Sequence, residues 1–145
     1  MNVLTIAGSD PSSGAGIQGD IKTFTALGVY GLSVVTALTS QNSSKFFRSE
    51  PASPDMIKSQ IRSVLSDFKI SAIKIGMVYD KKTIKTIYTE LKNVKVPVVL
   101  DPIFQSTTGG ILLRQDAFSF FKKLLIPLAQ GVETVHFLAG DILKL

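Results

Sequence analysis

Short apolar runs alternate along this chain with longer segments in which apolar residues recur every three or four positions. The apolar runs are typical of buried strands and lie at Val3–Ala7, Leu32–Leu38, Ala72–Met77, Pro97–Leu100 and Val132–Leu138. The helical spacing predicts helices over residues 15–28, 54–68, 80–91 and 116–128. Alternating strands and helices predict an α/β fold, in which a parallel sheet carries helices on its faces and residues 1–145 form a single domain.

The segments that follow the predicted strands hold the candidate chemistry. In a parallel α/β sheet, ligands bind outside the carboxyl ends of the strands. The candidate site is therefore built from Gly8–Asp20, Thr39–Ser44, Gly76–Asp80 and Asp101–Gly110. The polar stretch between Leu38 and Pro51 is predicted to be a loop.

Composition and charge exclude several classes of protein. Of the 145 residues, 45% are hydrophobic and 19% are charged, which favours a folded core over a disordered chain. The absence of cysteine excludes disulfides, a thiolate nucleophile and sulfur-ligated metals within this sequence. The one histidine, His136, is expected to be a half-buried structural residue. The net charge is +5, but the basic residues are scattered, so we expect solvated helix faces and no nucleic-acid partner.

No segment predicts a membrane or secretory destination. The apolar run at the N-terminus is short and has no basic residue before it, unlike a signal peptide. Residues 23–44 carry no formal charge, but glycines and polar side chains interrupt them, so they are not expected to span a membrane. A cytoplasmic location is expected.

Gly14, Gly16 and Gly19 form a GxGxxG pattern after the first predicted strand. Glycines let backbone N–H groups approach a ligand closely, and the N-terminus of the following helix favours negative charge. A nicotinamide site would also need an acidic residue about 20 positions further on. The sequence there is uncharged, and the next acidic residue is Glu50. A nicotinamide dehydrogenase is therefore an alternative that an NADH fluorescence titration without response would remove.

Individual side chains at the predicted sheet edge each allow two interpretations. Asp20 lies one turn inside the first predicted helix, where it either contacts a ligand or is a surface residue favoured by the helix dipole. Gln41 and Asn42 can hydrogen-bond the edge of a heterocycle or serve ordinary loop chemistry. Met77 can pack on a flat ring or fill the core. Their place at one edge of one sheet favours a binding site.

Several longer segments carry a more specific pattern than any of these residues alone. They are Ala7–Asp20, Lys22–Phe24, Ala26–Gly31, Thr36–Asn42, Lys74–Met77 and Val99–Phe104. In this order, and over about residues 2–128, they closely resemble the hydroxymethylpyrimidine and phosphomethylpyrimidine kinases of thiamine biosynthesis. The resemblance implies a ribokinase-like three-layer αβα sandwich. It also implies ATP-dependent phosphorylation of 4-amino-5-hydroxymethyl-2-methylpyrimidine or its monophosphate.

The same resemblance implies roles for particular residues. The pyrimidine would lie over the glycine-rich turn, with Gln41 at its polar edge and with Met77 and Ile103 packed against it. The implied substrate-binding residues are Gly8, Ala15, Asp20, Gln41, Met77 and Ile103. ATP and Mg²⁺ are expected from the family, and pyridoxal kinases are relatives that act on a different substrate.

The last part of the sequence departs from the family pattern. The family binds the nucleotide through an Asn and Glu pair after the fifth strand and through a later glycine-rich loop that carries a cysteine. Residues 130–140 resemble the family only at Phe137–Gly140. The sequence to Leu145 contains neither that loop nor a cysteine. We therefore expect the substrate-binding N-terminal portion of a truncated pyrimidine kinase, with no catalytic or metal-ligating residue identified in it.

Half of an αβα sandwich exposes a strand edge and apolar helix faces that the other half would cover. We therefore expect homo-oligomers or marginal stability in solution. A monodisperse monomer that melts cooperatively, measured by light scattering and calorimetry, would contradict this expectation. The sequence leaves four functions open: an active kinase, a catalytically inactive pyrimidine-binding protein, a pyridoxal-kinase-like relative and the nicotinamide dehydrogenase.

Overall fold

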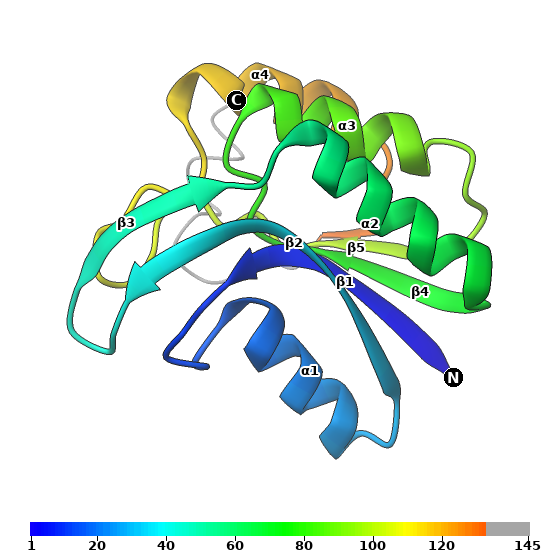
Figure 1. Ribbon diagram of the computed structural model, residues 1–145. Coiled ribbons are helices and arrows are strands. Elements are labelled where there is room, and N and C mark those ends of the chain that lie inside the picture. Colours follow the sequence, from blue (N-terminus) through cyan, green and yellow to red (C-terminus); the bar gives the residue numbers. More distant parts are fainter. Residues whose placement is uncertain (133–145) are drawn as a thin grey trace.

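The computed structural model describes residues 1–132, which fold around one sheet (Figure 1). Its 6 strands lie in the order β3-β2-β1-β4-β5-β6. Their bounds are β1 Asn2–Ser9, β2 Tyr30–Gln41, β3 Phe46–Pro51, β4 Ile70–Ile75, β5 Val98–Leu100 and β6 Gly131–Val132. Neighbouring strands are parallel except for β2 and β3, which are antiparallel. The predicted mainly parallel sheet is therefore confirmed.

Helices cover both faces of this sheet. Figure 1 shows α1 (Gly16–Ala26) on one face, and α2 (Pro54–Asp67), α3 (Lys81–Leu91) and α4 (Phe118–Phe120) on the other. The three-layer αβα arrangement is therefore confirmed. The helix predicted over residues 116–128 is less regular than expected. It consists of α4 between a 3-10 turn at Gln115–Ala117 and a π-type turn at Phe121–Leu125. Pro127, which has no N–H, does not continue the helix beyond this turn.

The expectation of a loop between Leu38 and Pro51 is wrong. Strand β2 continues to Gln41, and β3 then returns antiparallel to it, with Pro51 opposite Ala37. In this edge strand no side chain is buried and half of them are exposed, so it lacks the apolar signature of the buried strands. Of the strand predicted at Val132–Leu138, the structure describes only the first residue, in β6; the remainder, with His136, lies outside the described residues.

Local sequence signals fix where the helices begin and end. Ser53 precedes α2 and its side chain accepts a hydrogen bond from the Met56 N–H at 3.2 Å, with Pro54 as the first helical residue. Asp80 caps α3 in the predicted way, because its carboxylate accepts from the Thr83 N–H at 2.8 Å. Gly28 has a φ of +69° and ends the α1 region, as glycine commonly does after a helix.

The main hydrophobic core lies between the sheet and the layer formed by α2, α3 and α4. Its fully buried aliphatic side chains come from β1, β4 and the two long helices and include Leu4, Ile6, Ile57, Ile61, Ile73, Ile75, Ile84, Ile87 and Leu91. On the other face, α1 buries none of its own side chains completely. Most of the apolar packing that stabilises the sheet is therefore on the face covered by α2 and α3.

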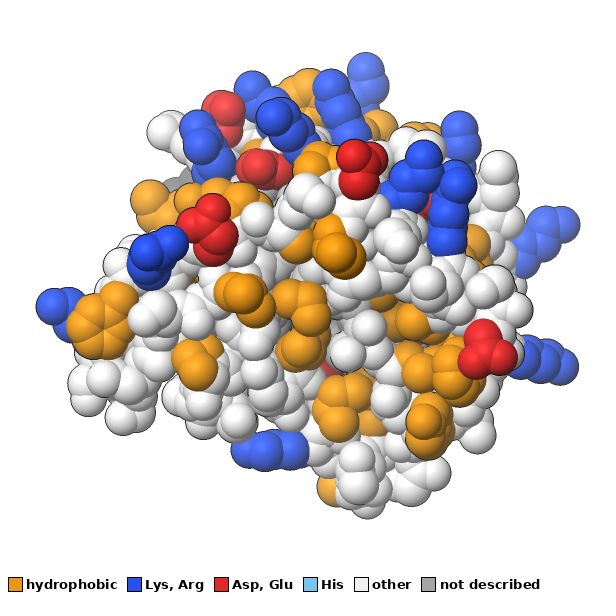
Figure 2. All heavy atoms as spheres, in the orientation of Figure 1, with side chains coloured by type: hydrophobic (Ala, Val, Ile, Leu, Met, Phe, Trp, Pro, Cys, Tyr) orange, Lys and Arg blue, Asp and Glu red, His pale blue; other side chains and the backbone are white. Residues whose placement is uncertain are grey.

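Charged side chains are concentrated on the outer surface of the helical layer. Figure 2 shows many basic side chains over α2 and α3, which carry Lys58, Arg62, Lys81, Lys82 and Lys85. Some of these are paired, since Arg62 contacts Glu90 at 2.8 Å and Lys81 contacts Asp116 at 3.1 Å. Within residues 1–132, no helix is long and apolar enough to cross a lipid bilayer.

A β-bulge shapes the end of β1. The register with β2 shifts between Ala7 and Gly8, so that Ala7 pairs with Val35 and Gly8 pairs with Ala37. Next to the bulge, the Gln60 side chain of α2 accepts from the Val35 N–H at 2.9 Å and donates to the Val35 carbonyl at 3.1 Å. Gln60 thus replaces a strand partner where β3 no longer pairs with β2.

Replacing Gln60 with Ala should lower the free energy of unfolding by about 1–3 kcal/mol, because a partly buried N–H and C=O lose their partners. Urea denaturation of Gln60→Ala and of the control Ser59→Ala, which changes an exposed residue on the same helix, would measure this. Equal stabilities of the two variants would show that Gln60 does not hold the bulge.

Candidate functional site

The carboxylate of Asp10 organises the turn between β1 and α1. One oxygen accepts from the Ser12 N–H at 2.9 Å and from the Ser12 hydroxyl at 2.7 Å. The other accepts from the backbone N–H groups of Gly14 at 3.1 Å and Ala15 at 2.9 Å. Burial opposes ionisation of this buried carboxyl, but these hydrogen bonds outweigh burial and hold the pKa of Asp10 below its ordinary value.

The glycine-rich turn is therefore closed on itself. The N–H groups of Gly14 and Ala15 already donate to Asp10, so an incoming phosphate would meet a carboxylate at the start of α1. Gly16 has a φ of +58°, and a side chain there would collide with the carbonyl oxygen of Gly8. Two N–H groups of the GxGxxG segment are thus used within the turn itself.

Met77 lies in a small apolar cluster that is separate from the main core. Its side chain is 6% exposed and packs with Ala37 and Leu112, and Ile103 lies against the same cluster. Gly8 borders it, because a Cβ on Gly8 would lie 2.6 Å from the Met77 sulfur. The structure thus brings together three predicted site residues, Gly8, Met77 and Ile103. Met77 serves in packing, which is one of the two roles expected for it.

Gln41 stands beside this cluster at the end of β2. It pairs with Phe46 of β3, and the Phe46 ring packs against the cluster. Within residues 1–132, the Gln41 side-chain amide has no hydrogen-bond partner, so it can still donate and accept. Asn42 serves as an ordinary turn residue, because its side-chain oxygen accepts from the N–H groups of Ser44 at 3.0 Å and Lys45 at 2.9 Å.

Asp20 belongs to a partly buried charge network on the α1 side of the sheet. The Lys74 ammonium donates to the two Asp20 oxygens at 3.0 and 3.2 Å, and the Thr5 hydroxyl donates to Asp20 at 2.5 Å. The same ammonium contacts Asp101 at 3.1 Å. Burial would lower the pKa of Lys74, but Asp20 and then Asp101 outweigh it and raise that pKa above its ordinary value. Asp20 is therefore not the solvated surface residue of the alternative interpretation.

The loop after β5 satisfies most of its own polar groups. The Ser106 hydroxyl accepts from the Gly110 N–H at 2.8 Å, and the Gln105 side chain donates to the Gly109 carbonyl at 3.1 Å. Gly110 packs so closely on the Phe46 ring that a Cβ there would overlap it. The hydroxyl-rich segment therefore holds the loop against β3.

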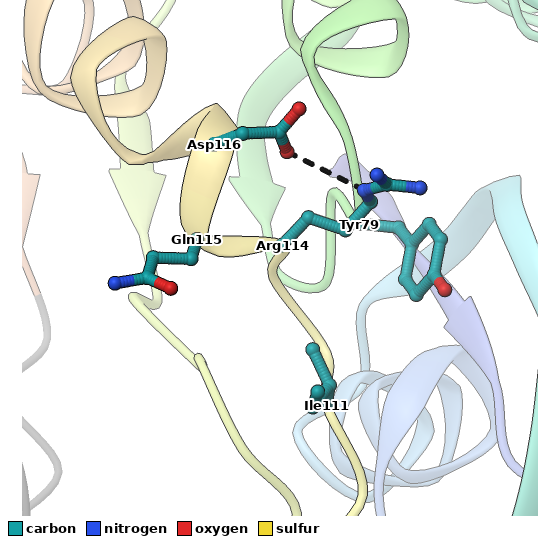
Figure 3. Close-up of a pocket in the computed structure, with 5 residues that line it drawn as sticks. All are labelled: Tyr79, Ile111, Arg114, Gln115 and Asp116. Carbon is teal, nitrogen blue, oxygen red and sulfur yellow. Dashed lines mark hydrogen bonds and ion pairs between the residues drawn. The ribbon is translucent and has the colours of Figure 1, made fainter.

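A pocket of about 580 Å³ opens next to this edge, as Figure 3 shows. It is lined by Tyr79, Ile111, Arg114, Gln115 and Asp116. Arg114 points toward Asp116 and contacts it at 3.3 Å. None of the site residues predicted from the sequence lines this pocket, although the Tyr79 ring also packs against the Met77 cluster.

The predicted site residues surround one edge of the sheet, but in two groups. Gly8, Gln41, Met77 and Ile103 border the apolar cluster. Ala15 is the N-cap residue of α1, and Asp20 lies on the α1 side of the sheet in the charge network. Gly76 lies next to both groups, because it directly precedes Met77 and a Cβ on it would lie 3.3 Å from the Lys74 nitrogen.

Sequence reasoning missed two residues that organise the site, Asp10 and Lys74. An Asp followed by Pro and Ser in a turn commonly binds the backbone ahead of it, which was the available signal for Asp10. Lys74 is a lone charge inside an otherwise apolar strand, and such a charge is seldom buried without a partner. Its partners are distant in sequence, so the pattern gave no means to name them.

Within residues 1–132, no group of three or more His, Cys, Asp or Glu side chains could hold a metal ion. In the turn at the start of α1, the Asp10 carboxylate accepts from the N–H groups of Gly14 and Ala15.

Comparisons with known proteins agree with the resemblance found in the sequence. The pattern of the phosphomethylpyrimidine kinase family matches residues 10–134. The chain is 46% identical over 126 residues to the hydroxymethylpyrimidine/phosphomethylpyrimidine kinase of Rhizobium meliloti, which covers 87% of this chain and 47% of that protein. It is 38% identical to the protein of the same name from Aquifex aeolicus, over 99% of this chain and 58% of that one. The chain thus spans about half the length of these curated relatives.

Solved structures extend the comparison to the fold. A phosphomethylpyrimidine kinase from Clostridium difficile superposes with a TM-score of 0.85 at 45% identity, over 91% of this chain and 58% of that one. A pyridoxal kinase from Staphylococcus aureus in complex with pyridoxal gives a TM-score of 0.79 at 32% identity, over 90% of this chain and 48% of that one.

Asp10→Asn should lower the free energy of unfolding by about 1.5–3 kcal/mol at neutral pH, because an amide replaces a carboxylate that accepts four hydrogen bonds. The pKa of Asp10 is lowered on folding, so its contribution is present above the pKa of the unfolded chain and is lost as the pH falls through the folded pKa. The difference between the wild type and Asp10→Asn should therefore shrink in acid.

Urea denaturation at a series of pH values would measure this difference, with Asp67→Asn at an exposed position as the control. A difference that stays constant down to strongly acidic pH would show that the ionised Asp10 does not hold the turn.

Proposed function

The chain belongs to the phosphomethylpyrimidine kinase family, and from this we propose that it carries the pyrimidine-binding part of an ATP-dependent kinase of thiamine biosynthesis. The substrate is 4-amino-5-hydroxymethyl-2-methylpyrimidine or its monophosphate, and the expected location is the cytoplasm. One observation supports this proposal most strongly: the apolar cluster around Met77 lies beside the free amide of Gln41 at the carboxyl ends of the strands, and the half-buried Asp20 lies on the α1 side of the same sheet.

The chemistry of the edge suits a neutral aminopyrimidine. The ring is flat and apolar on its faces, so the Met77 and Ile103 side chains offer matching walls. Its ring nitrogens and amino group need a partner that both donates and accepts, which the Gln41 amide provides. The amino group also donates, and a carboxylate such as Asp20 accepts. These residues bind and orient the ring.

Phosphate transfer depends almost entirely on positioning and on cations or helix N-termini around the transferred group. ATP and Mg²⁺ are expected as donor and cofactor from the family, and a pyridoxal kinase among the structural relatives forms a complex with ADP. The described residues contribute the acceptor side of this reaction in our proposal. A chain that binds the pyrimidine without transferring phosphate is the alternative outcome.

A second candidate substrate is pyridoxal. The specific observation in its favour is the structural match to the pyridoxal kinase from Staphylococcus aureus bound to pyridoxal. Pyridoxal is also a substituted six-membered heterocycle, so the apolar walls alone do not reject it. The two candidates differ in the amino group, which is present in the aminopyrimidine and absent from pyridoxal.

Isothermal titration calorimetry should show that the chain binds 4-amino-5-hydroxymethyl-2-methylpyrimidine more tightly than pyridoxal. Gln41→Ala should weaken this binding about tenfold or more, because a lost hydrogen bond to a polar ring edge removes on the order of 1.4 kcal/mol. Asn42→Ala is the matched control, since its side chain is used by the turn. Equal losses in the two variants, or tighter binding of pyridoxal, would contradict the proposed role of Gln41 or the proposed substrate.

Release of ADP, measured with ATP, Mg²⁺ and the aminopyrimidine, then distinguishes an active kinase from a protein that only binds the pyrimidine. Turnover above that of Gln41→Ala would show that the chain, alone or as an oligomer, also builds a phosphate site. Binding without turnover would identify a pyrimidine-binding protein.

A further inference from the structure

The charge network on the α1 side of the sheet is unusual for its burial. Lys74 extends from β4, Asp20 from α1, and Asp101 follows β5, and their side chains are only 18%, 17% and 10% exposed. Both carboxylates contact the same ammonium nitrogen, at 3.0 and 3.1 Å. Within residues 1–132, the ion pairs of this network involve only these three charged groups.

One cation therefore serves two carboxylates, and the network carries a net negative charge. Carboxylates that share a site without a cation repel each other. Lys74 offsets this repulsion, because its ammonium contacts both Asp20 and Asp101. Such a charge is costly to bury unless its hydrogen bonds are satisfied.

The network is not fully satisfied. Asp101 has one buried carboxylate oxygen without a hydrogen-bond partner among the described residues. Asp20 receives two contacts from Lys74 and one from Thr5, so about one of its four acceptor positions is still open. The orientation of the Asp20 carboxylate, and with it the direction of the open position, is set by Lys74 and Thr5.

We propose that Lys74 is a positioning residue of the pyrimidine site: it holds the Asp20 carboxylate turned so that its open position accepts a hydrogen bond from the pyrimidine amino group. This inference rests on the proposed function, because it takes Asp20 to contact the pyrimidine. Asp101 is the second negative charge that Lys74 must balance. Removing Lys74 leaves Asp20 and Asp101 without the cation that both carboxylates contact.

This arrangement leads to a specific expectation for substitutions of Lys74 and Asp101, alone and together. Lys74→Met keeps an unbranched side chain of similar length but removes the charge, so affinity for the pyrimidine should fall about tenfold or more at neutral pH. Adding Asp101→Asn should restore part of the affinity, because the repelling charge is gone.

The experiment is calorimetric titration of 4-amino-5-hydroxymethyl-2-methylpyrimidine into the wild type, Lys74→Met, Asp101→Asn and the double variant at neutral pH. Lys69→Met, which removes an exposed lysine just before β4, controls for net charge. Circular dichroism reports folding. If Lys74→Met does not fold, the double variant is compared with Asp101→Asn and is expected to bind more weakly.

The outcomes separate this inference from the proposed function. Weaker binding by Lys74→Met that Asp101→Asn partly restores supports it. Unchanged binding by Lys74→Met overturns it, and so does a double variant that binds more weakly than Lys74→Met, because a purely structural network loses stability with each partner removed. No binding by the wild type overturns the proposed function itself, and this inference with it.

Discussion

Parallel pairing of β1, β2, β4 and β5 requires their carboxyl ends to meet at one edge of the sheet. Each of these strands therefore delivers the residues that follow it to the same place. The turn that contains Asp10 follows β1, Gln41 ends β2, Met77 follows β4 and Ile103 follows β5. The candidate site is thus a consequence of strand direction, and the individual motifs only decide which chemistry is delivered there.

The charges at this edge limit the kind of group that can lie beside them. Asp10 is satisfied by four donors within its own turn, among them the N–H groups of Gly14 and Ala15. Asp20 and Asp101 share the ammonium of Lys74, which leaves the network negative. Next to these carboxylates a neutral group that donates hydrogen bonds is favoured over an anion, so the phosphate of a phosphorylated substrate would have to lie away from them. The electrostatics therefore suit the proposed pyrimidine ring.

Periodicity predicted what depends on local sequence. The buried strands, the Asp80 cap and the start of α2 at Ser53 and Pro54 followed from apolar spacing and capping residues. Strand β3 could not be predicted this way, because an exposed edge strand has no apolar alternation to read. The roles of Asp20 and Lys74 could not be predicted either, since they are 54 positions apart and only the fold makes them partners. The roles of the site residues in binding stay predictions.

Strand β3 and the loop after β5 together form one side of the candidate site. Phe46 of β3 packs on the Met77 cluster, and Gly110 of the loop packs on the same ring with no room for a side chain. The loop also carries Ile103, so contact with β3 fixes where Ile103 lies relative to Met77. An edge strand covered in this way gains a partner for its apolar side. The apolar side of the candidate site is therefore shaped by an antiparallel strand that the parallel βαβ units alone would not supply.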